Sequence, residues 1–326
     1  MEKNGIQVYF VVNDLPLWQY MFSDIKADGG SVVIYPFTGP QKRSEKLLYR
    51  LCNNRFALKP FQILWCRHII KKWNVSKEKP LFVFLNPVLP YFKKAFYSFL
   101  IERYNAVLAV LFIDSAEPLG DQYMNTIKPM LDLVGDKIYT YDKTDALRYG
   151  WNYTCCYYSA LPVEPIPTAC DVFLVMYDKG RAEKAVKCYD YFAHRGIKCL
   201  FYIHGVDPAF ALTHQRTGIV YNHPLQYLEV IRLLSGCRVI LELCQHGQKA
   251  NTLRAFEAVT YHKRLLTDNS NIRFFPGYDP EEMKYFASTE DIEVIGQEFF
   301  QIEQKTPKHQ YCGEFSPRHL VEKIRS

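Results

Sequence analysis

Residues 238–269, RVILELCQHGQKANTLRAFEAVTYHKRLLTDN, contain a complete strand–loop–helix–strand unit. The apolar run RVILEL predicts a buried strand, TLRAFEAVTYHK has the spacing of an amphipathic helix, and RLL is a second apolar, strand-like run that ends in Thr-Asp-Asn. A strand that is apolar along its whole length is typical of a parallel sheet covered on both faces. This segment therefore predicts an α/β fold.

The same alternation of strands and helices runs through the chain on both sides of a proline-rich segment. We expect strands at 6–12, 31–37, 81–85, 106–113, 137–142, 171–177, 198–205 and 218–222, in addition to the two above. Residues 161–168, LPVEPIPT, contain three prolines and no periodic apolar pattern, which predicts a linker. The fold class is therefore α/β, with two Rossmann-like doubly wound domains at 1–163 and 164–326. In such folds ligands bind outside the carboxyl ends of the strands.

The composition limits the class of partner. A chain of 326 residues that is 48% hydrophobic and 15% aromatic can bury substantial cores, which excludes a disordered protein. Lys and Arg exceed Asp and Glu by 40 − 34 = 6, an excess that suits a small anionic ligand or weak attraction to a membrane surface. The chain has no dense basic tail of the kind that binds nucleic acid, so we expect no nucleic-acid partner.

Several features predict a cytoplasmic location. The ten cysteines show no CxxC spacing, and the chain starts MEKNG without a secretory leader, so we expect reduced cysteines in a cytoplasmic protein. The apolar run at 106–113 is too short to span a bilayer. Four basic residues have two interpretations, peripheral association with anionic lipid at the inner face of the plasma membrane or plain solubilising charge: Lys42, Arg43, Lys71 and Lys72.

The loop after RVILEL predicts an anion site. Gln245, His246 and Gln248 supply hydrogen-bond donors directly after a buried strand. Asn251 and Thr252 are good N-cap residue types, which places a helix start next to this loop. A helix start presents unpaired N–H groups and the positive end of the helix dipole, so it attracts a phosphate.

Arg254 and Glu257 lie three residues apart and therefore share one face of the predicted helix. We expect Arg254 to reach a diphosphate from the first turn and Glu257 to accept hydrogen bonds from a ribose diol. The spacing predicts that Leu253, Phe256 and Val259 face the sheet. The alternative is an ordinary Arg/Glu pair on a solvated helix face.

A second polar junction follows the strand at 171–177. Lys179 and Arg181 can supply positive charge from the opposite wall of the same cleft, or they belong to an ordinary hydrophilic turn. The sequences GxGxxG and GxxxxGK[ST] are absent, as are DxD, HExxH and any Cys/His cluster with zinc spacing. We therefore expect neither a metal site nor a bound cofactor.

Several stretches carry a family resemblance: 177–199, YDKGRAEKAVKCYDYFAHRGIKC; 227–269, YLEVIRLLSG followed by CRVILELCQHGQKANTLRAFEAVTYHKRLLTDN; LFIDSAEP at 111–118; and KIYTYDKTDALRYGWNY at 137–153. In order and spacing they resemble bacterial lipopolysaccharide and capsule-type glycosyltransferases of GT-B architecture, including the CgeB-like group. The resemblance implies two facing Rossmann-like domains, a nucleotide-sugar donor held mainly by the C-terminal one, and a glycan or lipid-linked glycan acceptor. It also implies transfer without an essential metal.

On this resemblance Gln248, Thr252, Arg254 and Glu257 match the donor-side motif. Two departures are that Ala250-Asn251 replaces the Gly-Leu common before the threonine, and that Glu242 stands where an aspartate is usual.

Inverting transfer would also need a base for the acceptor hydroxyl, and we expect it at the carboxyl end of a strand in the first domain. Asp114 fits this position best, Asp14 is the second candidate, and Glu117 is nearby. Each carboxylate has the alternative role of a helix cap or a loop salt bridge, and the sequence does not decide between inversion and retention. The expected function is glycosyl transfer; a non-catalytic sugar- or nucleotide-binding protein and a nucleotide-sugar epimerase are the alternatives.

Overall fold

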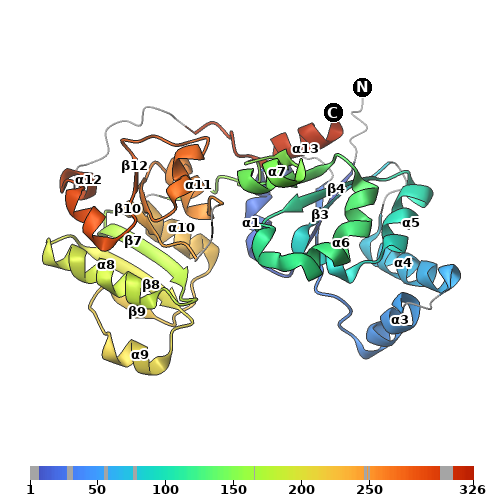
Figure 1. The fold of residues 1–326 in the computed structure, drawn as a ribbon, viewed down its shortest axis with the longest axis horizontal. Coiled ribbons are helices and arrows are strands. Elements are labelled where there is room, and N and C mark those ends of the chain that lie inside the picture. Colours follow the sequence, from blue (N-terminus) through green and yellow to red (C-terminus); the bar gives the residue numbers. More distant parts are fainter. Residues whose placement is uncertain are drawn as a thin grey trace. The chain divides into compact units, whose positions relative to one another are not determined.

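The computed structural model describes residues 7–27, 32–54, 58–75, 79–164, 166–245, 248, 250–301 and 311–326. The chain divides into two compact units, Met1–Ser159 together with Phe315–Ser326, and Ala160–Glu314. Each unit is built on one six-stranded sheet, with helices packed on both faces of that sheet (Figure 1). The predicted α/β class with two Rossmann-like domains is confirmed.

The sheet of the first unit is parallel throughout. Its strands are β1 (Val8–Val12), β2 (Val32–Pro36), β3 (Leu81–Leu85), β4 (Val107–Phe112), β5 (Ile138–Thr140) and β6 (Asn152–Tyr153). They lie in the order β2-β1-β3-β4-β5-β6, so the direction of winding reverses between β1 and β3. Every residue of β1 and β3 is buried, as expected for strands covered on both faces.

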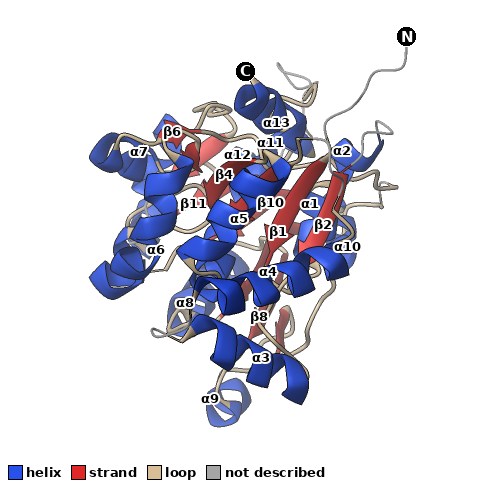
Figure 2. Ribbon diagram, turned by 90° about the vertical axis from the view of Figure 1, so that its right-hand side faces the viewer, coloured by secondary structure: helices blue, strands red, loops and turns tan. Residues whose placement is uncertain are grey.

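The helices of the first unit cover this sheet from two sides (Figure 2). They are α1 (Leu17–Met21), α2 (Ser23–Ala27), α3 (Arg43–Asn53), α4 (Lys59–Trp73), α5 (Lys94–Tyr104), α6 (Gly120–Val134), α7 (Lys143–Tyr149) and α13 (Pro317–Arg325), with 3-10 turns at Asn86–Tyr91 and Glu117–Leu119. Trp65 of α4, Phe96 of α5 and Met130 of α6 share one core with one face of the sheet. On the other face Phe22 stacks on Phe10 at 4.2 Å between ring centroids.

The second unit has the strand order of a Rossmann domain. Its strands are β7 (Cys170–Tyr177), β8 (Cys199–His204), β9 (Ile219–Tyr221), β10 (Cys237–Glu242), β11 (Arg264–Thr267) and β12 (Met283–Tyr285). They lie in the order β12-β11-β10-β7-β8-β9, all parallel, so the winding reverses between β7 and β10. This reversal is the topological switch point at which open α/β sheets bind ligands.

Helices also flank the second sheet. They are α8 (Ala182–His194), α9 (Pro208–Thr213), α10 (Tyr227–Ser235), α11 (Leu253–Thr260) and α12 (Glu298–Gln301), with 3-10 turns at Ser270–Phe274 and Thr289–Val294. Phe192 of α8 and Phe300 of α12 share one core with alternate residues of β7, β8 and β10. None of the helices that the structure describes in either unit combines the length and the apolar composition that a membrane span requires.

The C-terminal helix belongs to the first unit, whereas the sequence-based boundaries assigned all of 164–326 to the second domain. The Arg318 guanidinium donates to the carbonyl of Asp24 at 2.8 and 3.1 Å, and the Lys137 ammonium donates to the carbonyl of Ile324 at 2.9 Å. The boundary between the units lies at 159/160 rather than 163/164. An amphipathic pattern shows which face of a helix is buried but not which sheet it is buried against, so the sequence could not reveal this return of the chain.

The predicted linker is packed rather than loose. The backbone N–H of Leu161 donates to the Tyr261 hydroxyl at 3.0 Å. A Cβ atom placed on Gly236 would lie 2.8 Å from the Ile166 side chain, so this glycine permits the close approach of the segment. Described residues of 161–168 therefore lie along the second unit without forming a helix or strand of their own.

Candidate functional site

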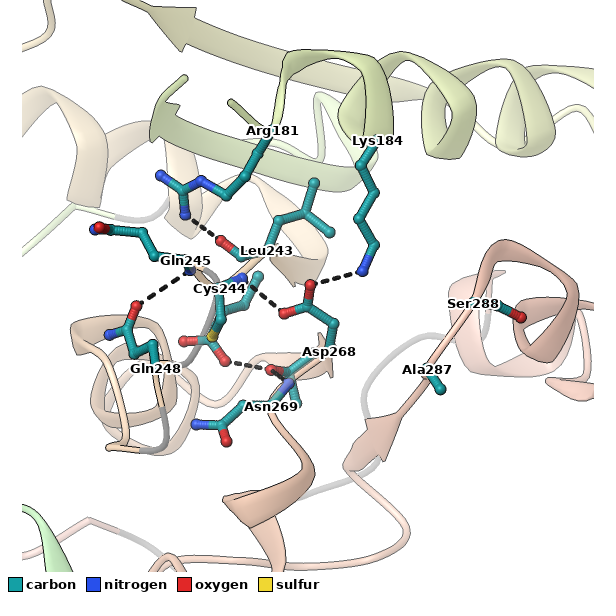
Figure 3. A network of polar contacts seen from close by, with 12 residues as sticks. Arg181, Lys184, Leu243, Cys244, Gln245, Gln248, Asp268, Asn269, Ala287 and Ser288 are labelled. Atoms are coloured by element: carbon teal, nitrogen blue, oxygen red, sulfur yellow. Dashed lines mark hydrogen bonds and ion pairs between the residues drawn. The ribbon is translucent and has the colours of Figure 1, made fainter. Parts of the chain in front are cut away.

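The candidate site lies at the carboxyl ends of β7 and β10, the two neighbouring strands at the switch point of the second sheet. One loop, 178–181, joins β7 to α8, and the other follows β10 and ends at α11. Arg181 connects them, because its guanidinium donates to the carbonyl of Leu243 (Figure 3). The structure therefore brings together the two polar junctions that the sequence placed around one ligand.

Arg181 braces these loops from within. Besides the bond to Leu243, its guanidinium donates to the carbonyls of Tyr177 at 2.5 Å and Asp178 at 3.1 Å. Burial lowers the pKa of Arg181, although nearby groups, Cys244 first, act in the opposite direction. The side chain thus holds the strand ends in register, and its hydrogen bonds are directed at the protein's own backbone. Lys179, by contrast, is exposed at the tip of the turn with φ +42°.

Asp178 caps α8, which distinguishes the start of this helix from that of α11. Its carboxylate accepts hydrogen bonds from the backbone N–H groups of Arg181 at 2.9 Å and Ala182 at 2.6 Å. A carboxylate at this helix start already occupies two donors and repels a second anion. The start of α8 is therefore the less suitable of the two for phosphate.

The start of α11 is capped by a neutral hydroxyl. Thr252 is the N-cap, as the sequence predicted: its Oγ1 accepts from the backbone N–H of Arg254 at 3.1 Å. The same hydroxyl donates to one carboxylate oxygen of Glu242, and the Thr267 hydroxyl donates to the other. Glu242 is 3% exposed, and its burial raises its pKa. A glutamate at the end of β10 therefore fixes the position of the N-cap hydroxyl.

Asn251 lies directly before this N-cap. It is 9% exposed, and its side-chain oxygen has no hydrogen-bond partner among the described residues. Buried side-chain amides are usually satisfied, so an unpaired one beside a helix start is available to a ligand hydroxyl or amine. Ala250, the preceding residue, is held in place because its carbonyl accepts from the Asn269 amide at 3.1 Å.

Arg254 and Glu257 form a buried ion pair. Arg254 Nη1 lies 2.5 Å from Glu257 Oε2, and the Tyr227 hydroxyl of α10 donates to Glu257 Oε1 at 3.0 Å. The Glu257 side chain is 0% exposed and that of Arg254 is 16% exposed. Burial raises the pKa of Glu257 to about 7, against the opposing effects of Arg254 and Tyr227.

This burial corrects two expectations from the sequence. The alternative of an Arg/Glu pair on a solvated helix face is wrong, because the carboxylate is completely covered. The face of α11 that is buried also differs from the predicted set: Phe256 and Glu257 are buried, whereas Leu253 and Val259 are only half-buried. A charged residue was not expected on the inner face because periodicity arguments assign that face to apolar side chains.

Two residues that the sequence analysis did not select complete the network. Asp268, directly after β11, accepts from the Lys184 ammonium at 2.8 Å and from the backbone N–H of Cys244 at 2.6 Å (Figure 3). Lys184 comes from the first turn of α8 and also lies 5.3 Å from the ring centroid of Phe286. The available signal was the carboxylate that ends a predicted strand, the same signal that selected Asp114.

The structure describes part of the loop between β10 and α11. The backbone N–H of Gln248 donates to the carbonyl of Gln245 at 3.0 Å, and that of Gln245 donates to the Gln248 side chain at 3.3 Å. These bonds tie Gln245 to Gln248, between the end of β10 and the start of α11. His246, which the sequence placed in the same donor group, lies outside the described residues.

The first unit carries the two candidate bases at the carboxyl edge of its own sheet. Asp14 follows β1 and Asp114 follows β4, with β3 between these strands, and both carboxylates are exposed. The turn after Asp114 is held by two buried carboxylates that the sequence did not single out. Asp142 accepts from the Ser115 hydroxyl at 2.6 Å, and Asp145 accepts from the backbone N–H of Ala116 at 2.7 Å.

Two further features bear on the choice of site. Within the described ranges, no group of three or more His, Cys, Asp or Glu side chains is arranged to hold a metal ion. A cavity of about 970 Å³ lies beside α9 and β9, two strands away from β7. Arg216, a basic residue that lines it, is paired with Asp190 at 2.6 Å. The polar network therefore favours the switch point over this cavity.

No protein-family model and no curated protein sequence matches the chain. Several solved structures are similar to it. A glycosyltransferase from Rickettsia africae ESF-5 is 14% identical with a TM-score of 0.53, covering 99% of this chain and 98% of that one. The spinosyn rhamnosyltransferase SpnG complexed with thymidine diphosphate is 12% identical with a TM-score of 0.51, covering 98% and 100%. A protein from Listeria monocytogenes assigned as a UDP-N-acetylglucosamine 2-epimerase is 10% identical with a TM-score of 0.52, covering 90% and 88%.

At identities this low, structural likeness establishes the fold alone. The fold is that of GT-B glycosyltransferases, with two Rossmann-like domains. The grouping with lipopolysaccharide, capsule-type or CgeB-like enzymes is not tested by these likenesses and stays a prediction.

Proposed function

We propose that the protein is a glycosyltransferase that moves a sugar from a nucleotide-sugar donor to a glycan or lipid-linked glycan acceptor. The observation that carries the proposal is the start of α11, capped by a neutral hydroxyl at the switch point of the second sheet. The fold shared with two glycosyltransferases supports it, and one of these, SpnG, is complexed with thymidine diphosphate.

The donor's diphosphate would lie at the start of α11. The unpaired N–H groups of the first turn and the helix dipole stabilise negative charge, which grows on the diphosphate as the glycosidic bond breaks. Arg254 stands in this first turn and is partly exposed, so it can contact the diphosphate. Charge stabilisation of this kind needs no metal, and we propose transfer that is independent of divalent cations.

Glu257 would position Arg254. Its two oxygens are engaged by Arg254 and Tyr227, and it is fully buried. A direct contact with the ribose, as the sequence suggested, requires Arg254 to move away from the carboxylate. Asn251, with its unpaired side-chain oxygen, is the better-placed group to accept a hydrogen bond from a ligand hydroxyl.

The base for an inverting reaction would come from the first unit. Asp114 and Asp14 are exposed at the same edge of the sheet, on strands about 10 Å apart at the usual strand spacing. Asp114 is the first choice because Asp142 and Asp145 fix the turn that follows it. We extend the proposal to a lipopolysaccharide- or capsule-type acceptor on the cytoplasmic side, on the strength of the resemblance in residues 177–199 and 227–269.

A nucleotide-sugar epimerase is the second candidate. The likeness to the Listeria protein favours it, because the TM-score to that structure, 0.52, is close to the 0.53 for the Rickettsia glycosyltransferase. An epimerase would use the same nucleotide site but would need no acceptor. A non-catalytic binding protein would use the site without turnover.

One experiment separates these functions. The purified protein is incubated in EDTA with UDP-, TDP- and GDP-sugars, with and without oligosaccharide and lipid-linked acceptors, and products are identified by mass. Acceptor-dependent release of nucleoside diphosphate with a glycosylated product supports the proposal. Interconversion of the sugar without acceptor establishes the epimerase, and thermal stabilisation without turnover establishes a binding protein. Activity that returns only with manganese or magnesium contradicts metal independence. If the nucleotide sugars neither stabilise the protein nor are turned over, the proposed nucleotide site is rejected.

A further inference from the structure

Helices α3 and α4 expose an apolar surface at the side of the first unit. α3 packs against α4, and Figure 2 shows the two helices next to each other. Cys52 and Trp65 face inward and are 1% exposed. Five large apolar side chains face outward and are 49–66% exposed: Leu47, Leu51, Leu58, Phe61 and Leu64. We call these five, with the exposed basic residues between positions 42 and 72, the α3–α4 face.

The basic residues of the α3–α4 face lie in the same two helices or directly before α3, between and beside the apolar positions in the sequence. They are Lys42, Arg43, Lys46, Arg50, Arg67, Lys71 and Lys72, all exposed. Phe61, Leu64 and Lys71 recur at helical spacing, so the outer face of α4 is apolar in its first half and basic in its second. Glu45 is the sole acid between residues 42 and 73, and it is paired with Lys72 at 3.3 Å. The face therefore carries a strong excess of positive charge.

This combination selects one kind of partner. Clustered apolar side chains on a surface mark an interaction site. A second copy of the same face would bring two sets of seven basic residues together, which opposes self-association. A bilayer with anionic headgroups satisfies both features, because bases pair with the headgroups while apolar side chains enter the boundary with the acyl chains.

We propose that the α3–α4 face docks the protein onto a membrane surface that contains anionic lipids. Phe61 and the leucines insert into the headgroup layer, and the basic residues of the same face bind lipid phosphates. Docking is independent of the transferase proposal, since it uses neither the switch-point network nor the candidate bases. If both hold, docking would bring the enzyme to a lipid-linked acceptor.

Vesicle co-sedimentation of the full chain tests the proposal. We expect binding to vesicles of phosphatidylcholine with phosphatidylglycerol, weak binding to phosphatidylcholine alone, and loss of binding as salt increases. Each base near an anionic surface contributes about a five-fold factor, so Arg67→Gln with Lys71→Gln should weaken binding by roughly 30-fold. The matched control is Arg103→Gln with Lys128→Gln, an exposed Arg/Lys pair on α5 and α6. This control should bind as the unmodified protein does.

A second pair of variants tests the apolar component. Phe61→Ala with Leu64→Ala should weaken binding to anionic vesicles, whereas Leu147→Ala with Leu212→Ala, which removes larger exposed fractions elsewhere, should not. Circular dichroism confirms that each variant is folded. Three outcomes overturn the proposal: no binding to anionic vesicles, equal loss in the target and control pairs, or a dimer in sedimentation velocity that Phe61→Ala with Leu64→Ala abolishes. The dimer would assign the face to a second copy of the chain.

Discussion

Arg254 Nη1 lies 2.5 Å from Glu257 Oε2, and the Glu257 carboxylate is completely buried on the inner side of α11. The pair links the proposed diphosphate site at the start of α11 to the hydroxyl of Tyr227 on α10. Removal of one partner of a buried pair leaves an uncompensated charge, which destabilises the fold by itself. A change at Arg254 therefore tests ligand binding only when Glu257 has been neutralised first.

Arg254 should contribute to nucleotide affinity beyond its role in the fold. In a Glu257→Gln background, adding Arg254→Met should weaken binding of a nucleoside diphosphate by roughly 10- to 100-fold, because a charged hydrogen bond to the phosphate is lost. Titration calorimetry of both folded proteins measures the difference. The matched control, Arg232→Met on the exposed side of α10, should bind normally. Equal affinity with and without Arg254 would place the diphosphate elsewhere.

Glu257 should make stability depend on pH. Burial raises its pKa from 4.5 to about 7 in the folded protein, so its carboxyl group stays protonated over a range in which the unfolded chain is ionised. Below about pH 4.5 both states hold the proton and there is no penalty. As the pH rises to about 7 the folded state loses stability relative to the unfolded state, by roughly 3 kcal/mol in total.

Denaturant unfolding of the protein and of Glu257→Gln checks this expectation. The glutamine does not titrate, so the stability of the variant relative to the original protein should increase between about pH 4.5 and 7. Glu229→Gln, at an exposed position on α10, should leave the pH dependence unchanged. Parallel pH profiles for Glu257→Gln and the original protein would show that Glu257 titrates normally.

Thr252 should stabilise the fold through two bonds made by one hydroxyl. Thr252→Val removes the N-cap of α11 and leaves a buried oxygen of Glu242 without that donor, so the free energy of unfolding should fall by about 1–3 kcal/mol. Urea unfolding measures the change. Thr213→Val, at an exposed position on α9 where the hydroxyl bonds only within its own turn region, should cost much less. A comparable cost for both would argue against the buried network.

Asp114 should affect turnover without affecting donor binding. If it is the base of an inverting reaction, Asp114→Asn should lower kcat by about 10²- to 10⁴-fold and leave nucleoside diphosphate affinity unchanged. Asp14→Asn is measured in parallel, since it is the second candidate, and Asp121→Asn on α6 serves as an exposed control. Full activity of both Asp114→Asn and Asp14→Asn would remove these two residues from the mechanism.

Local sequence patterns predicted most of the strands and the start of α11. Continuous apolar runs such as 81–85 predicted buried parallel strands, and β3 occupies Leu81–Leu85. Thr252 was predicted as an N-cap because an N-cap depends on a side chain and backbone groups two residues away. Short or edge elements were missed: β6 at Asn152–Tyr153 and β12 at Met283–Tyr285 are too brief for a periodic signal.

By itself the sequence determined the two-domain α/β class, the strand-to-helix junctions and the helix start beside residues 250–252, because each depends on contacts between near neighbours in the chain. The tertiary structure decided which distant groups meet. It placed Asp268 beside Lys184, turned Arg181 onto the carbonyl of Leu243, buried Glu257 against Tyr227, and returned the C-terminal helix to the first unit. These relations depend on strand order and on which surface covers each helix, and residues that are far apart in the chain carry no local pattern that specifies either.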